Sequence, residues 1–336
     1  MSTRIATASG LAVVTAIALA AVTACSSSSS SSTTAATSPS ASASASASAS
    51  ASASTSASSG SNPLSGGGAS GSVVVGSANF PESELLAEVY ALALQDKGVK
   101  ATTKLNIGSR EVYYPQVAKG AITIFPEYNG ALLSGEVDPS STAKTTAAVD
   151  AALTAKLPSS LEILTPAAAQ DSDSMTVTAA TAAKYHLKTI ADLKPHASGW
   201  VLGAPSEFKT RTDGIAGLKA NYGLTFKSFD PLDESGPITL AALSSGKVQV
   251  ADVFTTTPQI ISDHLVSLAD PKFNFAAQNV IPLVYKADAT STITATLNAV
   301  SAKLTTAALL QMDNAVITDK ANYNTVAAAF LKAAGL

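Results

Sequence analysis

The sequence contains one cysteine, Cys25, and three histidines, His186, His196 and His264. A single thiol excludes an intramolecular disulfide, so the globular part of the chain must be held together by packing alone. None of the histidines lies at a recognisable spacing from a serine, a cysteine or an acidic residue. The sequence also lacks an H-E-x-x-H motif, a phosphate-binding loop and a nucleophile elbow. These absences argue against an enzyme, and we expect neither a metal nor a cofactor.

Charge is absent between Arg4 and Glu82. All 24 acidic residues and every basic residue except Arg4 lie from Glu82 onward, with a slight acidic excess. Nucleic-acid binding requires a basic face, so we expect no nucleic-acid partner. Residues 26–71 are almost wholly Ser, Ala, Thr and Gly, and such a chain buries too little apolar surface to offset the entropy cost of ordering. We therefore predict a disordered tether over residues 25–71.

The first residues are typical of a bacterial secretory signal. Arg4 precedes an apolar stretch from Leu11 to Val22, and small residues stand before Cys25. The run Val-Thr-Ala-Cys resembles a lipobox, which predicts a signal peptide over residues 1–24 and lipidation of Cys25 as the new N-terminus. A transmembrane anchor is the weaker alternative because the strongly apolar part is shorter than the ~20 residues of a span. We expect an extracytoplasmic protein tied to the cell membrane by its lipid anchor.

From residue 72 onward, short apolar runs alternate with helical patterns. The predicted strands are 73–76, 100–107, 122–128, 199–205, 224–230, 248–254 and 274–286. The predicted helices are 81–98, 110–120, 185–193, 211–223 and 238–246, with Ala-rich helices after residue 286. Strands that alternate with helices indicate a parallel or mixed sheet covered by helices, with ligands at the carboxyl ends of the strands.

The strand–helix pattern starts a second time in the middle of the chain. We therefore predict an α/β protein of two lobes joined by a two-segment hinge, the bilobal type II periplasmic-binding-protein fold. Lobe 1 takes residues 72–172 and 275–336, and lobe 2 takes residues 173–274. The chain crosses between the lobes near residues 168–174 and again near residues 275–282.

The informative segments are the loops that follow predicted strands. These loops read GSANFPESELLAEVY, GSREVYYPQVAKG followed by FPEYNGALL, EFKTRTDGIAGL and ADVFTTTPQI. In this order they resemble the quaternary-amine substrate-binding proteins of osmoprotectant ABC transporters, the glycine betaine, choline and carnitine class. The resemblance covers nearly all of residues 73–336. It implies partners that this chain does not encode, a membrane permease and an ATPase.

In that family an aromatic cage holds the trimethylammonium head by cation–π attraction, and an arginine holds the ligand carboxylate. The tyrosine of the family's PEYTG motif matches Tyr128, and the arginine of its EF-x-x-R-x-DG motif matches Arg211. The positions of three further cage tyrosines carry Asp173, Phe254 and Gln278. The resemblance therefore implies a variant site whose ligand is larger, more polar or less methylated.

Further candidates for contact with the ligand are Phe80, Tyr114, Asp171, Asn79 and Thr255. Two alternatives compete with these assignments. Arg211 is also suited to capping a helix or to pairing with Asp213, and surface pairs of this kind are weak. Asp171 and Asp173 are also suited to local turns in the hinge.

The sequence favours the solute receptor of an ABC importer, with a quaternary amine as the first choice of ligand. A receptor for another small cation or amino-acid-like solute is the alternative within the same class. A surface lipoprotein that keeps the fold and delivers nothing is the alternative from another class.

Overall fold

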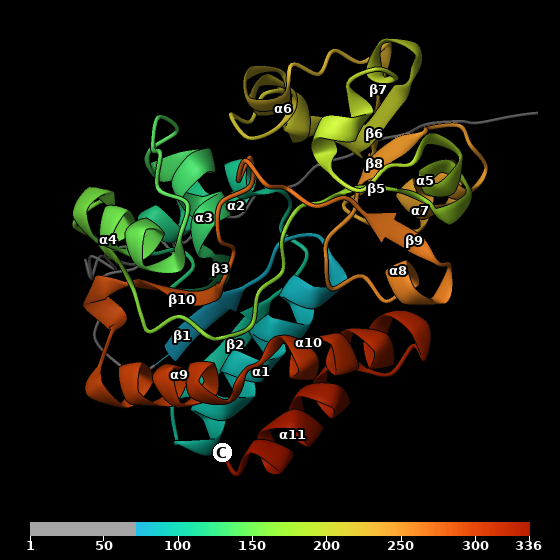
Figure 1. Ribbon diagram of the computed structural model, residues 1–336. Helices are drawn as coiled ribbons and strands as arrows, with labels where there is room; N and C mark the ends of the chain where they lie inside the picture. Colours follow the sequence, from blue (N-terminus) through green and yellow to red (C-terminus); the bar gives the residue numbers. More distant parts are fainter. Residues whose placement is uncertain (1–71) are drawn as a thin grey trace, which may run out of the picture. The chain divides into compact units, whose positions relative to one another are not determined.

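The computed structural model describes residues 72–336 (Figure 1). The predicted signal peptide, the predicted lipidation of Cys25 and the predicted tether over residues 25–71 lie outside the described residues. The strands of the described residues form two five-stranded sheets. This agrees with the expected α/β architecture.

The first sheet combines the start of the described chain with a strand from much later in the sequence. Its strands lie in the order β2-β1-β3-β10-β4. β1 pairs in parallel with β2 and β3, whereas β10 runs antiparallel to β3 and β4. The bounds are β1 Ser72–Gly76, β2 Lys100–Lys104, β3 Ile124–Tyr128, β4 Leu161–Ile163 and β10 Val280–Tyr285. Every residue of β3 is buried, as expected for a central strand covered on both faces.

The second sheet is formed by the middle of the chain alone. Its strands lie in the order β7-β6-β8-β5-β9, with β6 parallel to β7 and β8 and with β5 antiparallel to β8 and β9. The bounds are β5 Met175–Thr178, β6 Val201–Pro205, β7 Ser228–Leu232, β8 Val250–Asp252 and β9 Leu265–Ser267. Each sheet therefore has a parallel core and an antiparallel side.

The helices divide between the sheets in the same way. Those on the side of the first sheet are α1 Pro81–Asp96, α2 Arg110–Ala118, α3 Asn129–Leu132, α4 Thr146–Lys156, α9 Ser291–Lys303, α10 Thr306–Asp313 and α11 Tyr323–Ala334. Those on the side of the second are α5 Ala179–Tyr185, α6 Ile215–Tyr222, α7 Pro237–Ser244 and α8 Gln259–Ser262. No single helix among these is long and apolar enough to span a membrane, and only α9 with residues 306–318, bent by 88°, passes such a test as a pair.

α1 is the central helix of the first sheet's core. It packs against β1, β2 and β3 on one side and against α9 and α11 on the other (Figure 1). Leu85 and Leu94 are fully buried, whereas Leu92, which the sequence pattern places on the buried face, is only partly buried. Burial on both sides explains why a single apolar stripe is a poor description of this helix.

One sequence prediction of local structure is wrong, and several elements were not predicted. The predicted helix at 185–193 is absent, because α5 ends at Tyr185 and His186 adopts a left-handed backbone conformation, φ 55°. Only a 3-10 turn, Ile190–Leu193, follows. The sequence pattern also gave no indication of α4, β4, β5 and β9. The missed strands β4, β5 and β9 have three or four residues each, and no longer apolar run surrounds them as one surrounds β8.

Two segments connect the sheets, residues 164–174 and 268–279, and they lie against each other. The Asp171 amide donates to the Gln278 carbonyl at 3.2 Å, and the Val280 amide donates to the Ala169 carbonyl at 3.0 Å. Gln170 and Asn279 form an isolated antiparallel bridge. The expected two-segment hinge is therefore present, and its segments are held together by backbone hydrogen bonds.

Candidate ligand-binding site

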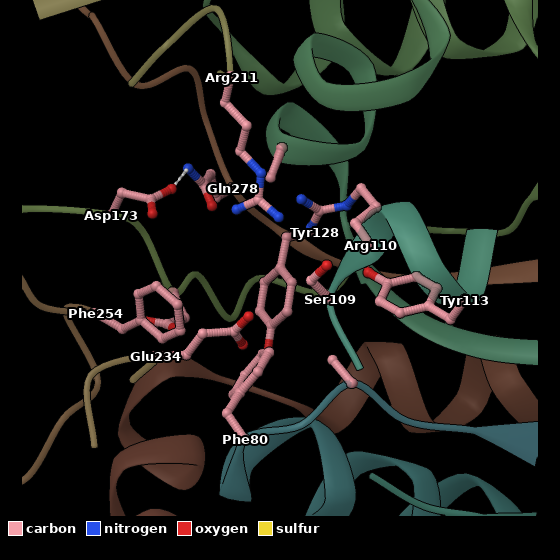
Figure 2. Close-up of a pocket in the computed structure, with 13 residues that line it drawn as sticks. Phe80, Ser109, Arg110, Tyr113, Tyr128, Asp173, Arg211, Glu234, Phe254 and Gln278 are labelled. Carbon is pink, nitrogen blue, oxygen red and sulfur yellow. Dashed lines mark hydrogen bonds between the residues drawn. The ribbon is translucent and has the colours of Figure 1, made fainter. Parts of the chain in front are cut away.

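A cavity lies where loops of the two sheets and both hinge segments meet (Figure 2). Its lining residues are Ala78, Phe80, Ser109, Arg110, Tyr113, Tyr128, Ala131, Asp171, Asp173, Arg211, Glu234, Phe254 and Gln278. Most of them follow the carboxyl end of a parallel strand, namely β1, β3, β6, β7 or β8. The cavity therefore occupies the place where open α/β sheets bind ligands.

Three aromatic rings line one side of the cavity. The Phe80 and Phe254 ring centroids are 5.3 Å apart with an edge-to-face orientation, and the Phe80 and Tyr128 centroids are 6.1 Å apart. Phe80 is the extended N-cap residue of α1, and Pro81 begins the helix. Proline at the first helical position fixes the direction in which the chain enters the helix, which holds Phe80 at the cavity. Both sheets contribute to this wall, because Phe80 and Tyr128 come from the first sheet and Phe254 follows β8 of the second.

Arg211 lies on the opposite side (Figure 2). Its Nε and Nη2 donate to the two carboxylate oxygens of Glu111 at 3.0 and 3.3 Å, and Glu207 lies 4.0 Å away. Although burial opposes the shift, Arg211 lowers the pKa of Glu111 to about 2. The alternative pairing with Asp213 is not observed, because Asp213 instead accepts from the Ser134 hydroxyl at 2.7 Å. Arg211 thus joins the second sheet's loop to α2 beside the first sheet.

A second arginine, Arg110, lies beside Arg211. Its Nε and Nη2 donate to the two oxygens of the buried Glu127 at 3.0 and 3.1 Å, and the Tyr113 hydroxyl donates to the same carboxylate at 2.7 Å. Burial would lower the pKa of Arg110, but the Glu127 charge outweighs it and the pKa is raised. Each guanidinium keeps Nη1 outside its bidentate pair, so two N–H donor groups remain at this end of the cavity.

Carboxyl groups occupy the hinge side of the cavity. Asp173 accepts from Gln278 Nε2 at 2.7 Å (Figure 2). Asp252, the last residue of β8, is 1% exposed, and its Oδ1 has no hydrogen-bond partner. Burial, and next the neighbouring Asp173 charge, raise the pKa of Asp252 well above its usual range. Asp173, which lines the cavity, is suited to accept from the N–H groups of a cation, whereas Asp252 is buried behind it.

Glu234 lies on the aromatic side of the cavity, in the loop after β7 (Figure 2). Burial, and next its proximity to Glu207, raise the pKa of Glu234 to about 8. At neutral pH this carboxyl is largely protonated, and a cation at the aromatic wall would favour its ionised form.

The structure brings seven of the ten predicted ligand-binding residues to the cavity lining: Phe80, Tyr128, Asp171, Asp173, Arg211, Phe254 and Gln278. Asn79 is exposed and does not line it. Tyr114, on α2, is partly buried and packs against a hydrophobic cluster of the first sheet instead. Thr255 is a hinge contact, since its hydroxyl donates to Asp171 Oδ1 at 3.2 Å and accepts from the Ser172 amide at 2.9 Å. These three residues do not line the cavity, and their contact with a ligand stays a prediction.

Sequence reasoning missed Ser109, Arg110, Tyr113 and Glu234. Glu234 follows a strand that is parallel in the sheet, and the position at a carboxyl strand end was the available signal. Ser109 and Arg110 begin α2 in a loop that the sequence had singled out. Within residues 72–336, no group of three or more His, Cys, Asp or Glu side chains is placed to hold a metal ion, and none of the three histidines lines the cavity.

Two mixed α/β sheets, joined by two crossing segments around a cavity at their strand ends, define a type II periplasmic binding protein. The family model for the substrate binding domain of ABC-type glycine betaine transport systems, OpuAC, matches residues 71–333, and the chain therefore belongs to this family. The family consists of substrate-binding proteins of transporters, which in ABC importers are extracytoplasmic.

Two curated relatives share about a quarter of their residues with this chain. The glycine betaine-binding protein YehZ of Escherichia coli K12 is 27% identical over 215 residues, which are 61% of this chain and 70% of YehZ. The ergothioneine transport permease/ergothioneine binding protein EgtU of Helicobacter pylori G27 is 25% identical over 204 residues. That match covers 60% of this chain but only 36% of EgtU.

Solved structures show the same fold. A glycine betaine/carnitine/choline ABC transporter protein superposes with a TM-score of 0.62 at 23% identity, covering 78% of this chain and 98% of that one. Lactococcal OpuAC in its closed form with glycine betaine gives a TM-score of 0.57 at 16% identity, covering 79% and 96%.

Proposed function

We propose that this chain is the extracytoplasmic solute receptor of an ABC importer and that it captures a small N-methylated cation or zwitterion in the cavity. The observation that supports this most directly is the division of the cavity into two ends. Phe80, Tyr128 and Phe254 present aromatic faces at one end, and Arg110 and Arg211 present N–H groups at the other.

Each end suits one part of such a solute. A quaternary ammonium has no N–H groups and is held by the faces of aromatic rings, for about 0.5–2 kcal/mol per contact. A carboxylate is held by charge-assisted hydrogen bonds from guanidinium groups. Glycine betaine carries both groups and is our first choice of ligand, in keeping with the name of the relative YehZ. We propose no catalytic role for the chain.

Contacts across the cavity support capture by hinge closure. Arg211 reaches Glu111, the Ser134 hydroxyl donates to Asp213, and the Thr256 hydroxyl donates to Glu82 at 2.6 Å. Each of these contacts joins the second sheet's loops to elements beside the first sheet. A ligand that adds contacts to both sheets shifts the population toward this closed arrangement.

The carboxyl groups favour a second candidate, a receptor for a cation that carries N–H groups. Asp173 lines the cavity, and the buried Asp252 lies behind it. A primary or secondary amine would donate hydrogen bonds to Asp173, whereas a trimethylammonium group cannot.

Titration calorimetry with glycine betaine, choline, carnitine, proline betaine, ergothioneine and a polyamine separates these candidates. The first proposal predicts the tightest binding for an N-methylated ligand. Tightest binding of the polyamine would favour the second candidate. Absence of binding to every compound would contradict both and favour the surface lipoprotein that delivers nothing.

Three further parts of the proposal concern the whole protein. They are a signal peptide over residues 1–24, a lipid anchor at Cys25 with a tether to residue 71, and lobe boundaries at residues 172/173 and 274/275. The distribution of strands supports these lobe boundaries, since β5 to β9 all lie between residues 175 and 267. A membrane permease and an ATPase would be the partners.

A further inference from the structure

Glu82 links the aromatic wall of the cavity to the opposite sheet. It lies in the first turn of α1 and is 3% exposed. The Tyr128 hydroxyl donates to Glu82 Oε1, and the Thr256 hydroxyl donates to Glu82 Oε2 at 2.6 Å. Tyr128 lines the cavity, and Thr256 lies in the loop after β8. One buried carboxyl therefore accepts a hydrogen bond from a tyrosine of the cavity wall and another from a threonine beside the opposite sheet.

A second buried carboxyl, Asp313, lies next to Glu82, because α10 packs against α1. Asp313 is the last residue of α10, is fully buried, and neither of its oxygens has a hydrogen-bond donor. Ionised carboxylates only accept hydrogen bonds, so two of them facing each other in a buried site repel. A proton between them converts this repulsion into a hydrogen bond.

The groups around Glu82 and Asp313 also favour a proton between these two carboxyls. Asp171 in the hinge faces Glu82, and its Oδ1 accepts from the Thr256 amide at 3.0 Å. The charge that acts on the pair from the hinge is that of Asp171, while Tyr128, Thr256 and, from α11, the phenol of Tyr323 are neutral. Burial, and next Asp313, raise the pKa of Glu82 well above its usual range, and burial raises the pKa of Asp313 to about 7.

We propose that Glu82 and Asp313 share a proton and that this holds Glu82 in place as a positioning residue. Glu82 then fixes Tyr128 in the cavity wall, and it accepts the hydrogen bond from Thr256 when the sheets close on the ligand. Glu82 needs both carboxyl oxygens as acceptors for these two hydroxyls. Asp313 needs only to keep a hydrogen between itself and Glu82.

The two amide variants, Asp313→Asn and Glu82→Gln, are expected to differ in their effect on the site. Asp313→Asn leaves both Glu82 oxygens in place and supplies an N–H where the proton lies. Glu82→Gln replaces one acceptor by a donor, which is left facing a hydroxyl group. Asp319→Asn is the matched control, since Asp319 is exposed and lies shortly after α10.

The first experiment uses the ligand-free protein and follows thermal unfolding from about pH 5.5 to about pH 8.5. A carboxyl whose pKa is raised by folding contributes stability that is lost as the pH rises through the folded-state value. The Tm difference between Asp313→Asn and wild type should therefore become more favourable to the variant as the pH rises to about 7 and should level off above it, and Asp319→Asn should show no such change. A pH-independent difference would overturn the shared proton.

The second experiment measures binding of glycine betaine by calorimetry at neutral pH, and this part depends on the proposed function. Glu82→Gln should raise the Kd about tenfold or more, whereas Asp313→Asn should stay within about twofold of wild type. Equal losses in both variants, or none in Glu82→Gln, would overturn the positioning role. If wild type binds no ligand of the panel, the proposed function fails, while the unfolding experiment still decides the shared proton.

Discussion

Arg211 has two roles at the cavity that a single substitution tests together. It pairs with Glu111 across the sheets, and its Nη1 remains at the end of the cavity opposite the rings. The first role supports closure around any ligand, whereas the second concerns only a ligand with a carboxylate. The ratio of two affinities separates these roles.

We expect Arg211→Ala to weaken glycine betaine more than choline, which has no carboxylate. A charge-assisted hydrogen bond in a closed cavity contributes about 1.5–3 kcal/mol, so the betaine-to-choline affinity ratio should fall about tenfold or more. Calorimetry with both ligands measures it. Lys209→Ala removes an exposed positive charge from the same loop and should leave the ratio unchanged. Equal losses for both ligands in Arg211→Ala would assign Arg211 to closure alone.

Glu234 connects cation binding to proton release. Its pKa is about 8, so at about pH 7.5 most of the protein carries the neutral acid. A bound cation favours the carboxylate and lowers this pKa, so choline binding should release part of one proton per protein molecule. Glu234→Gln should abolish this release. Calorimetry in buffers of different ionisation enthalpy measures the released protons. Glu162→Gln, on β4 away from the cavity lining, should behave as wild type. Equal proton release in Glu234→Gln and wild type would remove Glu234 from the site.

At the scale of elements, the close approach of α3 to the second hinge segment fixes the position of Tyr128. Two hydrogen bonds join Asn129 and Asn279. The backbone N–H of Asn129 donates to the backbone carbonyl of Asn279 at 3.0 Å, and the backbone N–H of Asn279 donates to the side-chain Oδ1 of Asn129 at 2.8 Å. The next residue, Gly130, leaves room for the hinge, because an added Cβ would lie 2.3 Å from the Ala277 carbonyl oxygen.

Gly130→Ala should therefore destabilise the protein by about 1–3 kcal/mol or more, the cost of forcing a methyl group into a packed interior. Denaturant unfolding measures the loss. Gly199→Ala is the matched control, since a Cβ there would meet nothing within 4 Å, and its backbone is not left-handed. An unfolding free energy for Gly130→Ala equal to that of the control would show that α3 and the hinge separate easily.

At the scale of the whole molecule, the described residues hold the cavity and both sheets, while the predicted lipid anchor lies before them. Binding and anchoring are therefore expected to be independent. Cys25→Ser should abolish labelling of the protein by a fatty-acid analogue and release it from the membrane, with no change in the affinity of the purified protein for its ligand. Labelling that persists in Cys25→Ser would exclude Cys25 as the lipidation site.

The sequence by itself determined the α/β class and the two-segment hinge, through strand and helix periods and the restart of the pattern in the middle of the chain. The seven predicted site residues that line the cavity came from the resemblance to the quaternary-amine family, carried by motifs such as those around Tyr128 and Arg211 at the ends of strands. Strands β4, β5 and β9 were missed because three or four residues are too few to show a period. The helix predicted at 185–193 begins where α5, Ala179–Tyr185, ends.

Only the tertiary structure decided which charges meet. Glu82 and Thr256 are 174 residues apart, and Arg110 and Glu127 lie on different elements that only sheet formation brings together. The sequence marks Glu82 merely as a favourable charge in the first turn of a helix. Its burial between Tyr128, Thr256 and Asp313 follows from packing α1 against β3 and α10, and burial is what turns an ordinary carboxyl into one that holds a proton.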